Sequence, residues 1–154
     1  MGTSYHAVAL SDDLVPQALP LIRATWPTVN LASWRNFVQA FAGPAAPQGS
    51  GVLGLRDQAG CLCGILAYRL DRELQACPIL AVHLFTAADL ANSRRTLRAL
   101  LDAAERRALE LGCKGLEIRL SRGQTELASR LRALGLSSDA KLFWKQIDSR
   151  VVSK

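Results

Sequence analysis

Residues 97–120 read LRALLDAAERRALELGCKGLEIRL, and this stretch decides how the chain folds. Apolar residues recur in its first half at helical spacing: Leu97, Leu100, Leu101, Ala104, Ala108 and Leu111. Charged residues occupy the other face of that helix, and Gly112 is a residue type with which helices commonly end. Residues 116–120 then alternate apolar side chains with Glu117 and Arg119, as a half-buried strand does. The stretch therefore predicts a helix, a tight turn and a strand.

Two helices are predicted near the start of the chain, after a first strand at residues 5–10. Ser11, Asp12 and Asp13 are residue types that cap helices, and apolar residues at helical spacing follow them. Pro20 lies inside this pattern, so we expect it to kink or shorten the first helix. The second helix ends at Gly43 and places four residues on one face: Trp34, Phe37, Val38 and Phe41. Aromatic residues at this spacing favour a core role over ligand contacts.

Strands are predicted after the Gly- and Pro-rich loop at residues 43–51. Residues 52–56 and 61–70 are apolar runs joined by the hairpin signal DQAG at residues 57–60, and residues 79–87 form a third run. A short helix is expected around residues 126–134, ended by Gly135, and a final strand at residues 141–147. The order is therefore β-α-α-β-β-β-α-β-α-β. It predicts a single domain, residues 1–154, of mixed α/β class with three layers.

Length and composition agree with one globular domain. The chain has 154 residues, of which 49% are hydrophobic and 21% charged, and this excludes a disordered, collagen-like or disulfide-scaffold protein. We expect no membrane span and no signal peptide, because no apolar run approaches the roughly 20 residues of a spanning helix. The expected location is the cytoplasm.

The charge balance points to anionic partners without choosing among them. Nineteen Lys and Arg residues against thirteen Asp and Glu give a net charge of +6. Nucleic acid, an acidic protein or a phosphorylated cofactor would all suit such a surplus. Five arginines lie within fourteen residues, on either a solvated helix face or an anion site: Arg94, Arg95, Arg98, Arg106 and Arg107.

The four cysteines do not suggest a metal site. Cys61 and Cys63 are one residue apart, which is not the Cys-x-x-Cys spacing of zinc or redox sites, and no His lies at ligand spacing from any cysteine. We expect Cys61, Cys63, Cys77 and Cys113 to be buried, reduced thiols.

The order and spacing of these elements resemble the GNAT (GCN5-related N-acetyltransferase) fold over about residues 7–147. In that family Leu100-Leu101, Gly112-Cys113 and residues 116–120 would correspond to the end of the cofactor-binding helix, its stop glycine and the fifth strand. Residues 131–136, LRALGL, resemble the family's Tyr-x-x-Leu-Gly-Phe segment. The resemblance implies an N-acetyltransferase that uses acetyl-CoA as co-substrate and holds no metal.

The resemblance also implies where the cofactor binds. The family holds the acetyl-CoA pyrophosphate on a loop of type Arg/Gln-x-x-Gly-x-Gly/Ala, where unpaired helix N–H groups and the helix dipole attract an anion. The matching residues are Asn92, Ser93, Arg94, Arg95, Thr96 and Leu97, followed by Arg98. Arg95 and Leu97 replace the glycines, so their side chains would crowd the phosphates while the arginines attract them. The fourth strand of the family pairs with the pantetheine arm, which implies backbone contacts from Phe85, Thr86 and Ala87.

Two family positions that transfer protons hold inert side chains in this sequence. Leu131 stands where a tyrosine is the common general acid, and Ala81 stands where histone-acetylating members carry a glutamate base. His83 lies two residues beyond Ala81, on the same strand face, and a His with a pKa near 6.5 can take a proton from an ammonium group. Glu117 is a second candidate base. The alternative for His83 is a structural role among its neighbours in a packed sheet.

Two other functions stay open beside acetyl transfer. The altered loop and Leu131 favour a GNAT-shaped binding module without turnover. Net charge alone favours a nucleic-acid-binding domain, and no aromatic–basic stacking motif accompanies it, so we do not expect nucleic acid as the partner. For the enzyme we expect a small-molecule or peptide amine as acceptor, and the protein could form a homodimer.

Overall fold

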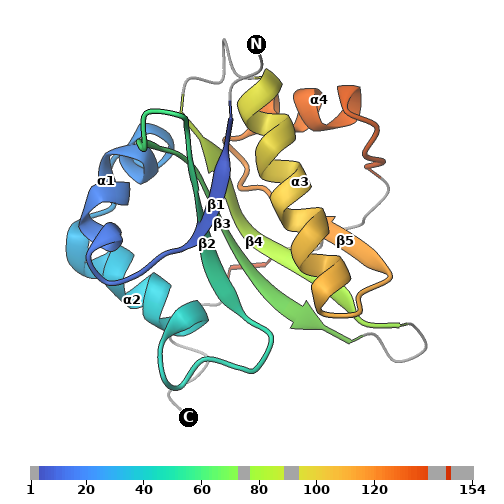
Figure 1. Ribbon diagram of the computed structural model, residues 1–154, viewed down its shortest axis with the longest axis horizontal. Helices are drawn as coiled ribbons and strands as arrows, with labels where there is room; N and C mark the ends of the chain where they lie inside the picture. The colour runs from blue at the N-terminus through green and yellow to red at the C-terminus, as the bar shows by residue number, and fades with distance from the viewer. Residues whose placement is uncertain (1–3, 73–76, 89–93, 139–144, 147–154) are drawn as a thin grey trace.

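A computed structural model describes residues 4–72, 77–88, 94–138 and 145–146 of the chain. Figure 1 shows a central sheet with α1 (Leu14–Thr25) and α2 (Leu31–Ala42) on one face and α3 (Arg94–Glu110) and α4 (Thr125–Ala133) on the other. This arrangement confirms the mixed α/β, three-layer prediction, and the elements follow the predicted order as far as α4. The predicted last strand, residues 141–147, lies almost wholly outside the described residues.

The described sheet has five strands in the order in which they occur in the sequence. They are β1 (His6–Ala9), β2 (Gly51–Arg56), β3 (Leu62–Asp71), β4 (Ile79–Ala87) and β5 (Gly115–Ile118). Strands β1 to β4 are antiparallel, whereas β5 runs parallel to β4. Parallel neighbours need a long crossover connection, which α3 supplies.

The predicted hairpin between β2 and β3 is present and has a clear local cause. The carboxylate of Asp57 accepts hydrogen bonds from the N–H groups of Ala59 and Cys61, at 2.9 and 3.0 Å. Gly60 takes the left-handed conformation, with φ of +85°, which is a backbone state that glycine adopts without strain. These contacts turn the chain and set the register of the two strands.

The divergence of β4 and β5 is the feature of the sheet that matters most for function. Only residues 79–82 of β4 pair with β5, and one further N–H, that of Arg119, donates to the carbonyl of Val82 at 2.9 Å. Strand β4 then continues to Ala87 without a described strand on that side. Among the described residues, no strand therefore pairs with residues 83–87 along this edge, which we call the open edge.

The core lies in two layers, one on each face of the sheet. On the α1 and α2 side, Trp34 is buried and its indole N–H donates to the carbonyl of Val15 at 2.8 Å, which fastens α2 to α1. On the other side α3 packs its predicted apolar face against β3, β4 and β5. The buried members of that face are Leu97, Leu100, Leu101, Ala104 and Ala108.

Three details of the predicted elements differ in part from expectation. Pro20 does not shorten α1, which continues for five residues beyond it, and its side chain lies on the exposed face. Asp13 occupies the N-cap position of α1, but its side chain makes no capping hydrogen bond. Not all cysteines are buried either. Cys61 and Cys77 are exposed, because they lie at the hairpin turn and just before β4, and Cys63 is only partly buried.

Candidate active site

The open edge of β4 has backbone groups from alternate residues only. In an antiparallel strand, successive residues turn their N–H and C=O groups toward opposite edges. The N–H of Ala88 donates to Cys63 of β3 at 2.8 Å, so Thr86, two residues earlier, also faces β3. Phe85 and Ala87 consequently face the open edge, and Thr86 has no backbone group to offer there. Its buried hydroxyl instead lies 3.0 Å from that of Thr25 and ties the end of α1 to β4.

Gln124 lies across this opening and was not singled out in the sequence. It is 8% exposed, and its side-chain N–H donates to the carbonyl of Phe85 at 3.0 Å. Its side-chain oxygen accepts from the N–H and hydroxyl of Ser121, at 3.0 and 3.1 Å. The residue thus links the loop before α4 to β4 where β5 has diverged. A polar residue at the predicted start of a helix was the signal that could have found it.

The start of α3 lies next along the chain after this edge. The helix begins at Arg94, three residues before the apolar stripe begins. Arg94, Arg95 and Arg98 are exposed, and Arg98 pairs with Asp102 at 3.3 Å. First-turn N–H groups have no partner within a helix, so they and the exposed arginines form a place that suits an anion. Asn92 and Ser93 lie outside the described residues.

Thr96 and Leu97 turn their side chains away from solvent. The Thr96 hydroxyl lies 3.0 Å from that of Tyr5, and Leu97 is 2% exposed within the core on the α3 side. The expectation that the Leu97 side chain would crowd a phosphate was therefore wrong, because that side chain packs against the sheet. Any contact of these two residues with a phosphate would come from the backbone N–H groups.

His83 lies in a bulge of β4 on the α1 and α2 side of the sheet. The register between β3 and β4 shifts here, since Ala67 pairs with Leu84 but Tyr68 pairs with Val82, so His83 is the extra residue. Its ring lies 5.4 Å from that of Phe41 in α2, measured between centroids. Bulges commonly re-aim a side chain next to a functional site. His83 is only partly buried, which leaves its ring accessible from solvent.

The surroundings of His83 favour its neutral form. Burial lowers the pKa of His83 below its ordinary 6.5, and the positive charges of Arg119 and Arg69 lower it further. The carboxylates of Asp71 and Glu117 act in the opposite direction and do not outweigh these causes. Only the neutral ring can accept a proton, so His83 is available as a base at neutral pH.

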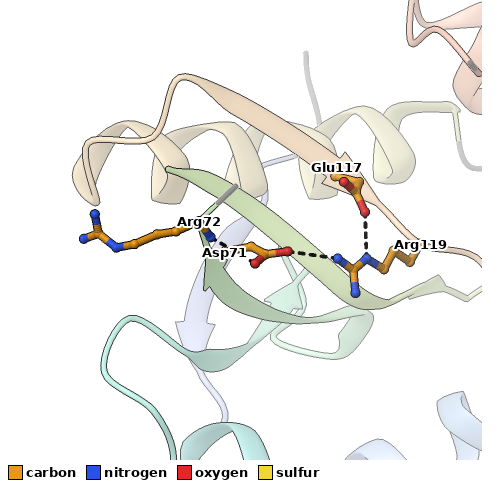
Figure 2. Close-up of polar contacts among 4 residues, drawn as sticks. All are labelled: Asp71, Arg72, Glu117 and Arg119. Atoms are coloured by element: carbon orange, nitrogen blue, oxygen red, sulfur yellow. Dashed lines mark hydrogen bonds and ion pairs between the residues drawn. The ribbon is translucent and has the colours of Figure 1, made fainter. Parts of the chain in front are cut away.

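Glu117 belongs to a chain of charges on the same face of the sheet. Figure 2 shows the guanidinium of Arg119 between two carboxylates, at 2.7 Å from Glu117 and 3.1 Å from Asp71. The three residues come from β3, β5 and the segment just after β5. Since the Glu117 carboxylate already accepts a hydrogen bond from Arg119, it holds that arginine in place. Among the described residues, the ring of His83 has no hydrogen-bond partner, so His83 is the candidate base whose ring is not engaged in this way.

The two positions that were expected to carry inert residues are both buried. Leu131 is 5% exposed and packs within the core between α4 and the sheet, and Ala81 is fully buried in β4. Burial also raises the pKa of the Cys63 thiol to about 11, which makes it unreactive at neutral pH.

Two kinds of site are missing from the part of the chain that the structure describes. Within these residues, no three His, Cys, Asp or Glu side chains gather closely enough to hold a metal ion. None of the described helices combines the length and the apolar character that crossing a membrane requires.

Comparison with solved structures gives many likenesses at low sequence identity. Aminoglycoside N-acetyltransferase AAC(6')-Iy in complex with CoA superposes with a TM-score of 0.76 at 13% identity, covering 96% of this chain and 97% of that one. Ribosomal-protein-alanine N-acetyltransferase from Brucella melitensis gives 0.73 at 14% identity, covering 95% and 100%. A GNAT family acetyltransferase from Staphylococcus aureus gives 0.71 at 14% identity, covering 96% and 100%. No protein-family model and no curated protein matches the sequence.

These structures extend over nearly the whole of both chains, so the likeness concerns the complete domain and not one motif. The diverging β4 and β5, the crossover helix between them and the helix pair on the opposite face are thus parts of one known architecture. The chain has the fold of the GCN5-related N-acetyltransferases.

Proposed function

We propose that the protein transfers an acetyl group from acetyl-CoA to an amine. The observation that carries this proposal is the open edge of β4 after Val82, with the exposed start of α3 following it and His83 on the adjoining strand face. The likeness to N-acetyltransferases, one of them in complex with CoA, supports the same activity.

The described residues suit the binding of CoA. Two features of the site differ from those expected. The N–H and C=O groups of Ala87 and the N–H of Phe85 face the open edge and can bind the amides of the pantetheine arm. The carbonyl of Phe85 already accepts from Gln124, so that side chain shares the edge with the cofactor. At the start of α3, Arg94 and Arg95 can bind the pyrophosphate in place of the glycine loop.

Catalysis in this proposal depends on position and on one proton transfer. The thioester supplies an activated acetyl group when acetyl-CoA is bound. Neutral His83 takes the proton from the acceptor ammonium, directly or through water, and the free amine attacks the thioester carbon. A C–N bond forms and the C–S bond breaks, and the extra proton that the nitrogen then carries passes through water to the leaving CoA thiolate. Holding amine and thioester together contributes the larger share of the rate.

A binding module without turnover is the second candidate. Buried Leu131 favours it, because leucine has no proton to give at the position where the resemblance implies a tyrosine acid. The test is release of free CoA thiol from acetyl-CoA in the presence of a panel of amines, with mass spectrometry of the products. Amine-dependent thiol release supports the enzyme. Binding of CoA without release, across the whole panel, would contradict the enzyme and support the module.

A further inference from the structure

Arg69 is a cation beside His83 that has no acidic partner among the described residues. Its guanidinium carbon lies 4.8 Å from the centroid of the Phe41 ring, and the His83 ring lies 5.4 Å from the same centroid. Its Nε atom is buried and has no hydrogen-bond partner within the part of the chain that the structure describes. No described carboxylate comes within ion-pair distance of it. Arg69 as a whole is only partly buried, so its Nη groups are the donors left for a ligand.

The neighbouring cation, Arg119, differs in having its charge already matched. Asp71 and Glu117 both bind it, as Figure 2 shows. Two arginines and two carboxylates thus act electrostatically on His83. Both carboxylates form ion pairs with Arg119, not with Arg69. An acceptor that carried only an ammonium group would add a further positive charge next to Arg69. An acceptor that also carried an anionic group would leave the net charge of the site unchanged.

The register of the sheet places these groups at a useful spacing. Arg69, Ala81 and Glu117 lie in one row across β3, β4 and β5. Adjacent strands are about 4.8 Å apart, so Arg69 and Glu117 are separated by about 10 Å at the backbone, with the small side chain of Ala81 between them. Arg69 thus faces the strand that carries His83, two residues beyond Ala81.

We propose that Arg69 binds an anionic group of the acceptor, a carboxylate or a phosphate, and so holds the acceptor amine at His83. This rests on the proposed function, because His83 marks where the amine reacts. A planar guanidinium suits both anions, and stacking on Phe41 fixes the orientation of its plane. The acceptor class is then an amino acid or an amino-sugar phosphate, not a simple amine.

The test uses matched pairs of amines that differ only in the anion. One pair is an amino acid and its amide, and the other is an amino-sugar phosphate and the unphosphorylated sugar. Binding of each is measured by titration calorimetry on the full chain, with and without CoA, and acetylation is followed separately as thiol release. The two pairs distinguish a carboxylate site from a phosphate site.

The variants remove the charge at Arg69 and at a matched position. Arg69→Gln removes it outright, and Arg69→Met removes it while keeping an apolar stem on Phe41, so one neutral variant remains if the other fails to fold. Arg106→Gln is the control, since Arg106 is exposed on α3 across the sheet. We expect the parent to bind the anionic member of one pair at least tenfold more tightly, and both Arg69 variants to lose that preference. Arg106→Gln should keep it.

The outcomes separate this inference from the proposed function. Equal binding of both members of each pair, or a preference that survives in both Arg69 variants, would overturn the anion site even if acetyl transfer is observed. A preference that depends on Arg69 supports the site even if thiol release is absent, and in that case the transferase proposal fails alone.

Discussion

His83 lies in a bulge of β4, and its surroundings there disfavour the protonated ring. Because burial and the charges of Arg119 and Arg69 lower its pKa, we predict an NMR titration with a midpoint below 6.5. The chain has only one other histidine, His6, so a His6→Gln variant assigns the signal. Arg119→Gln should move the midpoint upward, because it removes the largest electrostatic cause of the shift. An unchanged midpoint in that variant would contradict the assignment of causes.

Loss of the His83 ring should affect chemistry far more than cofactor binding. We expect His83→Gln to lower kcat by about 10²–10⁴, the usual contribution of a positioned general base, with CoA affinity nearly unchanged. His6→Gln, on the edge strand β1, is the matched control and should retain the parent's rate. Parent-like kcat in His83→Gln, in a variant that melts normally, would return His83 to a structural role.

Single residues also show what the sequence could and could not predict at this scale. The strand alternation that starts at Ala81 predicted the correct face for His83, although it did not reveal the bulge. The position of Arg69, which has no acidic partner among the described residues, was not foreseen, because it depends on contacts with Phe41 in α2, which is distant in the sequence. The carboxylate partners of Arg119 come from separate strands for the same reason.

Between elements, Gln124 is the link that bridges the opening of the sheet. Gln124→Ala would leave the carbonyl of Phe85 without this partner in a buried place, which costs about 1–3 kcal/mol. We therefore expect the free energy of unfolding, measured in urea, to fall by about that amount. Gln17→Ala, which removes an exposed amide on α1, should cause little change. Equal losses in the two variants would show that the bridge contributes nothing specific.

Helices and strands in which apolar residues recur at a regular spacing were predicted well. Features that depend on tertiary packing were predicted less well. The pattern over residues 97–111 identified α3, which extends over Arg94–Glu110. Pro20 was expected to disturb α1. The helix accommodates it, since burial of Leu21 and Ile22 just beyond Pro20 stabilises the last turns. No local sequence pattern encodes the divergence of β4 and β5.

Across the whole molecule, the lowered pKa of His83 makes stability depend on pH. In the window from 6.5 down to the folded-state pKa the unfolded chain binds more protons at this residue, so stability rises with pH and is lost as pH falls. Urea unfolding at about pH 5 and pH 7.5 should show a smaller loss on acidification for His83→Gln than for the parent. Equal losses of stability in the parent and in His83→Gln would mean that groups other than His83 cause the destabilisation at low pH.

The proposed acetyl transfer depends on the binding of CoA. Thermal melting against CoA up to millimolar concentration measures this binding most directly. A ligand at a hundred times its dissociation constant stabilises the folded state by about 2.7 kcal/mol, which for a chain of this size raises Tm by roughly 5–10 °C. We predict such a rise for the parent and a smaller one for the double variant Arg94→Ala/Arg95→Ala. A Tm that does not move in the parent at any CoA concentration would contradict the account.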